Sequence, residues 1–268
     1  MRPYSRVYAT VNLDAVASNM KSMRENLPVS TLIMGSVKAD GYGHGSVPIA
    51  KTIEPYVFGY AVATIDEGII LRRHGINKTI LILGVTHESQ YEELLRYDIR
   101  TAMFQYEKAK KLSDLAVKQG KKAVVHLALD TGMSRIGMKA DREHAKEAAS
   151  IAALEGIEVE GLFTHFARAD ETDKSAYEEQ YRRYKEFLGY LEELGVQIPI
   201  RHCSNSAGIV ESLESNHMDM VRAGIAIYGM YPSDEVDHNS VKLTPAMEIK
   251  SCITYITVSY THLTLPTN

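Results

Sequence analysis

The feature that most constrains the fold is a series of eight short apolar runs, separated from one another by longer stretches that include clear helical patterns. Several runs are apolar without polar alternation, as in Thr-Ile-Leu-Ile-Leu-Gly at residues 79–84. Such strands must be buried on both faces, which is typical of a parallel sheet covered by helices. The eight runs lie at residues 30–37, 57–63, 79–84, 99–103, 123–129, 159–164, 198–203 and 218–221.

The alternation of strands and helices predicts an α/β protein built as a (β/α)8 TIM-type barrel. Helical periodicity is clearest at residues 13–27, where apolar side chains recur every three or four positions, and at residues 173–194. In the second segment tyrosines fill much of the apolar stripe, and we interpret that stripe as core. An open, doubly wound sheet is the alternative fold, but it favours a Gly-x-Gly-x-x-Gly turn after the first strand, which is absent.

The two ends of the chain do not fit the barrel pattern. Residues 1–11 include a strand-like run that we expect to pair with a C-terminal β domain, and residues 12–231 hold the barrel. Residues 232–268 are expected to form a linker and an incomplete C-terminal β domain, with an opening strand at 246–258 and an atypical tail at 259–268. We therefore predict that the chain is truncated within that domain.

Charge and composition argue against several classes of partner. The 30 Lys and Arg against 34 Asp and Glu leave a net charge of −4, so we expect binding to neither nucleic acid nor an anionic membrane. No apolar stretch reaches the roughly 18 residues of a membrane span, and the N-terminus lacks the apolar core of a signal peptide. Cys203 and Cys252 match no disulfide framework or zinc motif. We expect a soluble, cytoplasmic protein.

Cationic residues follow several predicted strands, where a barrel places its reactive groups. Lys38 follows the first strand, His165 the sixth and Arg222 the eighth. Taken singly, His165 is interpreted as a core histidine, Arg222 as part of a rim salt bridge and Lys38 as a solvated surface lysine. However, Lys38 comes directly after a buried strand and before a loop with three glycines. A lysine removed from water at the mouth of a barrel becomes an imine-forming nucleophile.

Two loops of small residues follow the last two strands: Ser-Asn-Ser-Ala-Gly at 204–208 and Ala-Gly at 223–224. Barrels commonly bind phosphate in these loops, through backbone N–H groups and a helix N-terminus. A lysine nucleophile and a phosphate cradle on the same rim indicate pyridoxal 5'-phosphate as the cofactor.

Five ordered motifs resemble those of the alanine racemases, and the resemblance runs from about residue 6 to about residue 256. It implies an isomerase that interconverts L- and D-alanine and so supplies D-alanine for peptidoglycan. It also implies a barrel followed by a C-terminal β domain, in a head-to-tail homodimer. The motifs are Val-Lys-Ala-Asp-Gly-Tyr-Gly-His-Gly at 37–45, Leu-Asp-Thr-Gly-Met-Ser-Arg-Ile-Gly at 129–137, Phe-Thr-His-Phe-Ala at 163–167, His-Cys-Ser-Asn-Ser-Ala at 202–207 and Val-Arg-Ala-Gly-Ile-Ala-Ile-Tyr-Gly at 221–229.

The resemblance implies a role for each matching residue. Lys38 would bind the cofactor covalently and act as the base on one face of the substrate. Arg135 would contact the cofactor's phenolic oxygen and the substrate carboxylate. Arg222 would face the pyridine nitrogen, and His165 would lie against the ring and support Arg222. The residues around the phosphate would be Tyr42, Asn205, Ser206, Gly224 and Ile225.

An arginine at the pyridine nitrogen affects whether the bound amino acid undergoes transamination or racemisation. Most pyridoxal enzymes place a carboxylate there, which keeps the nitrogen protonated and makes the ring a full electron sink. An arginine with a pKa above about 12 cannot deliver that proton. The negative charge on the α-carbon is then less delocalised into the ring. This suppresses transamination and favours return of a proton to the same carbon.

The sequence departs from the family's pattern in two places. Ala128 stands where many members carry a modified lysine that braces the arginine, so Arg135 must be held by other groups. The family's second base is a tyrosine of the C-terminal domain that reaches into the partner's site, and no residue after Ile256 matches it, so we expect impaired catalysis.

Two alternative functions remain: a racemase of the same fold acting on serine or lysine, and a non-catalytic barrel that binds pyridoxal phosphate. The strand at 246–258 and the presence of Arg135 favour the racemase, because a single-barrel carrier needs neither.

Overall fold

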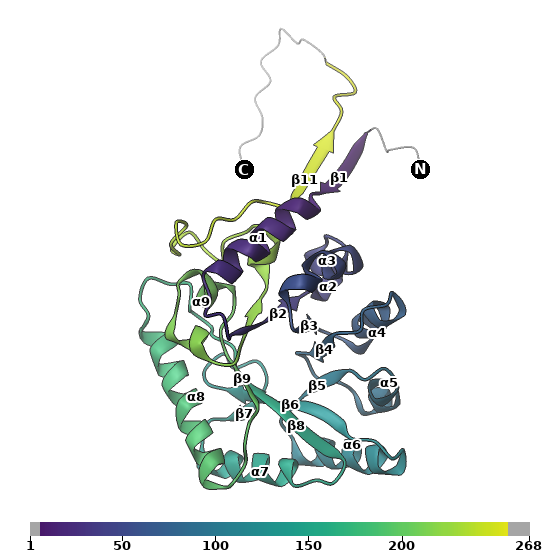
Figure 1. Cartoon of the computed structure of the whole chain (residues 1–268), viewed down its shortest axis with the longest axis vertical. Helices are drawn as coiled ribbons and strands as arrows, with labels where there is room; N and C mark the ends of the chain where they lie inside the picture. Colours follow the sequence, from purple (N-terminus) through teal and green to yellow (C-terminus); the bar gives the residue numbers. More distant parts are fainter. Residues whose placement is uncertain (1–5, 257–268) are drawn as a thin grey trace, which may run out of the picture.

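Eight parallel strands enclose the centre of the molecule and confirm the predicted barrel (Figure 1). The computed structural model describes residues 6–256. The strands of the barrel are β2 (Leu32–Ser36), β3 (Gly59–Val62), β4 (Thr79–Ile82), β5 (Arg100–Met103), β6 (Ala123–Asp130), β8 (Ile157–Phe163), β9 (Ile200–His202) and β10 (Met220–Ala223). Neighbours pair in the order β10, β2, β3, β4, β5, β6, β8, β9, and a short β7 (Met138–Lys139) adds to the end of β6.

Side-chain and loop contacts bring the two ends of this sheet together. The amide of Arg222 in β10 donates to the carbonyl of Ser204 just after β9 (2.9 Å). Asp219, which precedes β10, accepts the backbone amide of Arg201 in β9 (2.8 Å). The interior is filled by a layer of apolar side chains, as expected for a packed barrel rather than a pore. One buried cluster there comprises Met34, Ala61, Leu81 and Met220.

Helices surround the strands and bury one face each against them (Figure 1). The α-helices outside the Lys38 loop are α1 (Leu13–Glu25), α3 (Ser46–Ile53), α4 (Ile65–Arg73), α5 (Tyr91–Arg96), α6 (Tyr106–Lys118), α7 (Arg142–Ala152), α8 (Ser175–Glu193) and α9 (Ser206–Val210). Single 3-10 turns form η1 (Glu54–Tyr56), η2 (Glu88–Gln90), η3 (Glu214–His217) and η4 (Ile225–Tyr228).

The two helices with the clearest sequence patterns lie close to their predicted positions. The side chain of Asn12 caps α1 by accepting the amide of Ala15 (3.1 Å), and the helix ends two residues before the predicted 27. The tyrosine stripe of α8 is buried, as interpreted from the sequence. Tyr184, with no exposed surface, donates its hydroxyl to the carbonyl of Leu162 in β8 (2.7 Å) and so ties α8 to the barrel wall.

The predicted strand runs differ from the observed strands mainly at their ends. The eighth run, at 218–221, is observed two residues later, because the backbone of β10 pairs with β2 from Met220↔Leu32 to Ala223↔Gly35. Arg222 therefore lies within the strand, where β-sheet pairing fixes its backbone. Apolar patterning marks burial but does not mark where the hydrogen-bond ladder begins and ends.

A separate two-stranded sheet projects from the barrel (Figure 1). In it β1 (Val7–Val11) pairs antiparallel with β11 (Met247–Ser251), so the start of the described chain lies beside its end. The observed strand is shorter than the run at 246–258, and the tail at 259–268 lies outside the described residues. The division into three parts remains a prediction.

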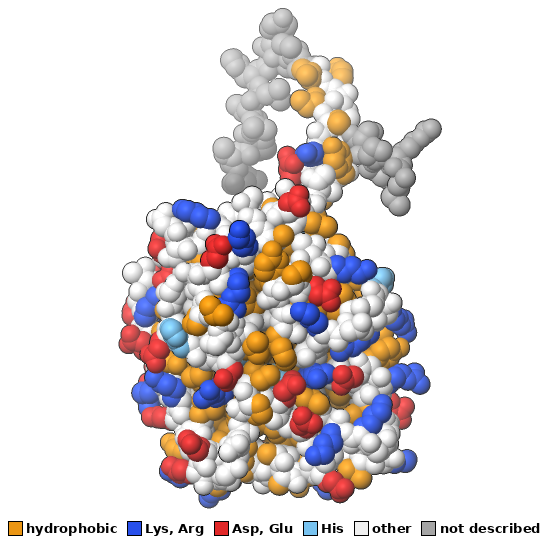
Figure 2. Space-filling model, in the orientation of Figure 1, with side chains coloured by type: hydrophobic (Ala, Val, Ile, Leu, Met, Phe, Trp, Pro, Cys, Tyr) orange, Lys and Arg blue, Asp and Glu red, His pale blue; other side chains and the backbone are white. Residues whose placement is uncertain are grey.

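The described surface carries mixed charge. Figure 2 shows basic and acidic side chains interspersed over the barrel face in view, with apolar side chains on the projecting strands. Among residues 6–256 no helix has both the length and the apolar character needed to cross a membrane.

Candidate active site

A cavity of about 390 Å³ opens at the carboxyl ends of the barrel strands. Every site residue expected from the sequence lines it. These residues are Lys38, Tyr42, Arg135, His165, Asn205, Ser206, Arg222, Gly224 and Ile225. They meet because the carboxyl ends of parallel strands share one rim, although they are spread over almost 190 positions of the sequence.

The backbone that follows Lys38 turns with left-handed geometry. In the one-turn segment α2 (Lys38–Tyr42), the φ angles are 51° at Ala39, 50° at Asp40, 61° at Gly41 and 52° at Tyr42. A left-handed residue other than glycine costs roughly 1–2 kcal/mol, so this turn persists only because its surroundings hold it. The three glycines of the loop suggested a special backbone, but the sequence did not predict a whole left-handed turn.

Side chains on both sides of the turn hold Lys38 and Tyr42 at the cavity. Asp40 accepts the amide of Ser46 (2.8 Å) through its carboxylate. The ring of Tyr42 packs against that of Tyr228, with centroids 4.9 Å apart. The ammonium of Lys38 lies 5.9 Å from the centre of the Tyr42 ring, so the lysine points along the cavity wall beside the tyrosine.

Small residues after β9 and β10 form a polar recess at one end of the cavity. Ser206 begins α9, and its hydroxyl accepts the amide of Gly224 (2.9 Å). A Cβ at Gly224 would lie 3.4 Å from the Tyr42 hydroxyl and 3.5 Å from the Ser206 hydroxyl. The glycine therefore keeps open a space between two hydroxyl groups, and Asn205 borders it while capping α9 through Gly208 (3.1 Å).

Arg222 is buried at the floor of the cavity, where each of its hydrogen-bond partners is an acceptor. Burial lowers the pKa of Arg222 to about 10, so its guanidinium stays protonated at neutral pH. Because it keeps its charge, it can only donate. The acceptors are the carbonyl oxygens of Thr164 (2.7 Å), His202 (3.1 Å) and Cys203 (3.2 Å) and the Nδ1 atoms of His202 (3.0 Å) and His165 (3.3 Å).

A chain of buried groups continues from Arg222 across the barrel. His202 Nε2 lies 2.8 Å from His126 Nδ1, and His126 Nε2 lies 2.9 Å from a carboxylate oxygen of Glu160. Since His202 accepts from Arg222 at Nδ1, its proton is on Nε2 and it donates to His126, which in turn donates to Glu160. Two neutral histidines thus connect a cation at the cavity to a carboxylate on the far side.

The burial of these groups sets their charge states. Burial lowers the pKa of His126 and brings that of His202 far below its usual value, with the charge of Arg222 acting in the same direction. Burial raises the pKa of Glu160, but hydrogen bonding to His126 and the charge of Arg100 outweigh this and lower it. The sequence analysis did not predict this series of hydrogen-bonded side chains. The clearest signal available was His126, a polar residue in the middle of an apolar run; Glu160 and His202 lie in strands that contain other charged residues.

His165 stays neutral in this environment. Burial is the largest cause and the charges of Arg222, Arg135 and Lys38 add to it, which together lower the pKa of His165 to about 3. Its Nδ1 accepts from Arg222, so the ring can orient the arginine without carrying a charge of its own.

Arg135 belongs to a tight loop but has a free side chain within the described structure. Asp130 accepts the amides of Gly132 (2.9 Å) and Ser134 (3.0 Å) and so shapes the loop. The guanidinium of Arg135 is exposed at the cavity and makes no hydrogen bond to any residue in the described range. Ala128 is buried in an apolar cluster with Ala102 and Phe163, where it offers nothing that could brace an arginine.

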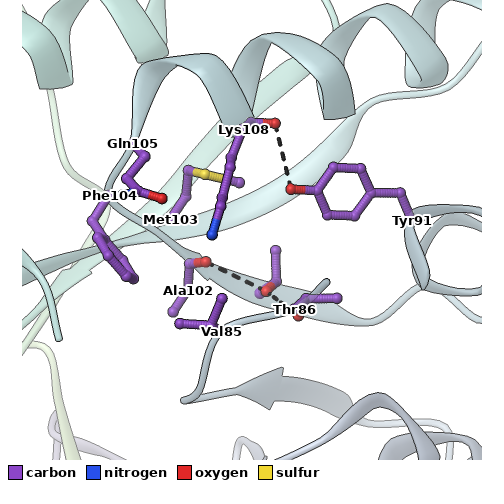
Figure 3. Close-up of a pocket in the computed structure, with 9 residues that line it drawn as sticks. Val85, Thr86, Tyr91, Ala102, Met103, Phe104, Gln105 and Lys108 are labelled. Atoms are coloured by element: carbon purple, nitrogen blue, oxygen red, sulfur yellow. Dashed lines mark hydrogen bonds between the residues drawn. The ribbon is translucent and has the colours of Figure 1, made fainter. Parts of the chain in front are cut away.

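A second, much smaller cavity of about 10 Å³ lies beside β5, between α5 and α6 (Figure 3). Thr86 and Thr101 share a hydrogen bond there (2.7 Å), and the Lys108 side chain reaches toward them. It has room for about one water molecule and shares no lining residue with the first cavity. The candidate active site is the cavity at the carboxyl ends of the strands, because that cavity is lined by the site residues expected from the sequence.

Comparison with known proteins matches residues 11–232 to the family described as alanine racemase, N-terminal domain. The chain is 43% identical over 251 residues to an alanine racemase of Desulforamulus reducens, covering 93% of this chain and 68% of the relative. An alanine racemase of Clostridium perfringens is also 43% identical, with 93% of this chain and 64% of the relative covered.

Solved structures agree with the sequence relatives. An alanine racemase of Clostridium difficile in complex with cycloserine superposes with a TM-score of 0.93 at 40% identity, covering 96% of this chain and 71% of that one. An alanine racemase from Bacillus anthracis with bound L-Ala-P gives 0.86 at 32% identity, with 97% and 69% covered. This chain spans about two thirds of the length of these relatives.

Proposed function

Because this chain belongs to the alanine racemase family, we propose that its barrel binds pyridoxal 5'-phosphate at Lys38 and provides the cofactor-bearing half of an isomerase that interconverts L- and D-alanine. The observation that carries the proposal is the single cavity lined by a lysine, two arginines and a recess of small polar residues. We also propose that the protein acts in the cytoplasm, where D-alanine is made for peptidoglycan.

The residues of the cavity fit this cofactor. The recess kept open by Gly224 is bordered by the hydroxyls of Tyr42 and Ser206, which suit an anionic phosphate. The half-buried amine of Lys38 lies on the same rim and suits covalent attachment to an aldehyde. Arg222 offers a permanent donor for a ring nitrogen, and neutral His165 offers a flat face for the ring.

When bound, the cofactor draws electrons from the α-carbon of the amino acid and so acidifies its proton. In our proposal Lys38 carries that proton on one face of the α-carbon. Arg222 remains protonated and donates only, so it holds the ring nitrogen without transferring a proton to it. This favours return of a proton to the same carbon. Arg135, exposed and without a partner in residues 6–256, is placed to bind the substrate carboxylate.

We infer that the working form is a homodimer. The projecting strands β1 and β11 support this, because Val7 and Ile249 expose 56% and 73% of their surface although both are apolar. Exposed apolar side chains of this kind mark an interaction surface. A second copy of the chain would bury them and would also supply a further acid/base group.

Spectroscopy and labelling test the cofactor site directly. Protein mixed with pyridoxal phosphate should absorb at about 420 nm, as this cofactor does when it is attached to a protonated lysine nitrogen. Reduction with borohydride followed by peptide mapping should place the label on Lys38. Lys38→Ala should abolish the band and Lys108→Ala, in the second cavity, should leave it unchanged. Label on another lysine, or a folded sample without the band, would contradict the proposal.

A further inference from the structure

The strained turn after Lys38 is held from outside by one carboxylate. Glu67 lies in the first turn of α4, which follows β3, and its Oε1 accepts the amide of Ala39 (2.7 Å). Its Oε2 accepts the amide of Ala63, at the end of β3 (2.7 Å). Hydrogen bonds to an ionised carboxylate are shorter and stronger than those between neutral groups. Glu67 thus joins the neighbouring loop to the first residue of the left-handed turn.

The Ala39 amide belongs to the peptide bond that directly follows Lys38. Orienting that peptide plane restricts the ψ angle of Lys38 and therefore the direction of its side chain. Ala63 lines the cavity, whereas Glu67 does not. The carboxylate consequently acts through the backbone and does not contact the cavity itself.

We propose that Glu67 is the positioning residue of the cofactor-binding lysine. This rests on the proposed function, since it assigns the residue that prepares Lys38 for attachment. Both carboxylate oxygens are in use, and each accepts a different amide. A glutamine in its place has one acceptor oxygen and an NH₂ group that can only donate. Glu67→Gln therefore keeps the size of the side chain and loses one of the two bonds.

The experiment compares Glu67→Gln with Asp141→Asn, a matched loss of charge. Asp141 caps α7 by accepting the amide of His144 (2.9 Å) and lines no part of the site cavity. Two quantities are measured: amide hydrogen exchange at Ala39 in the cofactor-free protein, and the dissociation constant for pyridoxal phosphate from the visible band. Glu67→Gln should speed exchange at least about tenfold and raise the dissociation constant at least about tenfold, and Asp141→Asn should change neither.

The outcomes separate the two levels of the proposal. If wild-type protein forms no band at all, the proposed function fails, whatever exchange at Ala39 shows. If wild type binds and Glu67→Gln binds equally well, the positioning role is overturned, even where exchange is faster. Equal losses in Glu67→Gln and Asp141→Asn would also overturn it. Glu67→Asp, which keeps both oxygens on a shorter arm, should recover binding relative to Glu67→Gln, and failure to recover counts against the role.

Discussion

The hydrogen-bond partners of the buried Arg222 guanidinium are all acceptors, so its surroundings suit a cation that donates. Its two terminal nitrogens serve three carbonyl oxygens and two histidine rings. A side chain with fewer donors leaves several of these acceptors unpaired in a region without water. A carboxylate placed there would in addition meet the lone pairs of the carbonyls. Replacing Arg222 with Glu is therefore a test of folding before it is a test of reaction specificity.

Arg222→Gln should lower the free energy of unfolding of the cofactor-free protein by roughly 3–5 kcal/mol. Removing one partner of a buried charged network leaves the other groups without hydrogen-bond partners. Arg182→Gln is the surface control. Arg182 pairs with Glu179 and Glu186 in exposed positions, and such pairs contribute little to stability because water and salt screen them. Urea titration measures both variants. A loss at Arg222 no larger than that at Arg182 would contradict the stabilising role of the buried network.

The neutral histidines predict how stability depends on pH. In the folded protein the pKa of His165 is about 3, against 6.5 for the free side chain, and those of His126 and His202 are also lowered. Below pH 6.5 the unfolded chain binds protons that the folded chain does not, so stability is greatest above pH 6.5 and falls as the pH drops toward 3. At pH 5.5 His165 should cost about 1.4 kcal/mol relative to pH 7.5, and His126 and His202 should act in the same direction.

The measurement is the urea midpoint at pH 7.5 and 5.5. His165→Asn should make the difference between the two pH values smaller, because the asparagine does not titrate. A wild-type midpoint that is unchanged or rises at pH 5.5 would show that these histidines are not held neutral by the fold.

At the scale of elements, α1 joins the barrel to the segment that leads to β11. Asn19, fully buried on α1, donates to the carbonyls of Ile227 (3.1 Å) and Thr244 (2.9 Å) and accepts the amide of Thr244 (2.7 Å). Gly229, which ends η4, allows the same segment to approach. Its φ is +84°, and a Cβ there would lie 1.9 Å from the Thr244 carbonyl oxygen. Asn19 and Gly229 therefore allow the segment just before β11 to dock against α1 and η4.

Asn19→Ala should destabilise the protein by roughly 2–4 kcal/mol, since it leaves two carbonyls and one amide without their partner in a buried position. Asn26→Ala, at the residue directly after the same helix, is the control. Asn26 donates to Ile209 and Ser212 near the surface, and its loss should cost about 1 kcal/mol. Thermal or urea unfolding distinguishes the two. Equal costs would mean that the Asn19 contacts contribute little to docking the segment on α1.

In the molecule as a whole, the candidate site residues lie together on one rim of the barrel. The projecting strands β1 and β11 lie apart from that rim. Racemisation requires an acid/base group on each face of the α-carbon. Among the described residues that line the cavity, Lys38 is the only amine, and His165 is unprotonated at neutral pH and hydrogen-bonded to Arg222. In the proposed function the described residues thus supply one base, Lys38, and we expect the second to come from outside them.

A polypeptide of the printed 268 residues, loaded with cofactor, should exchange the α-proton of one alanine enantiomer faster than it inverts the configuration. The absence of a second positioned group typically costs about 10²–10⁴-fold in rate. Proton NMR in ²H₂O follows the exchange and chiral chromatography follows the inversion, with Lys38→Ala as the inactive control. Inversion as fast as exchange for both enantiomers would contradict the one-base description.

The sequence by itself determined the barrel and the rim on which the candidate residues lie. Each apolar run by itself indicates a strand that is buried on both faces. The residues that follow parallel strands must lie at the same end of the sheet. The positions of Lys38 and His165 after their strands, and of Arg222 near the end of the last barrel strand, were therefore enough to predict that the three lie together.

Only the tertiary structure decided how those residues are held. The amide of Ala39 donates to Glu67, 28 positions away, and Arg222 reaches Glu160 through two histidines that are 76 positions apart. No local pattern encodes such contacts. For Arg222 and the two histidines the reason is burial: closure of the barrel removes them from water, so each must find its partner among the groups that the fold has brought beside it.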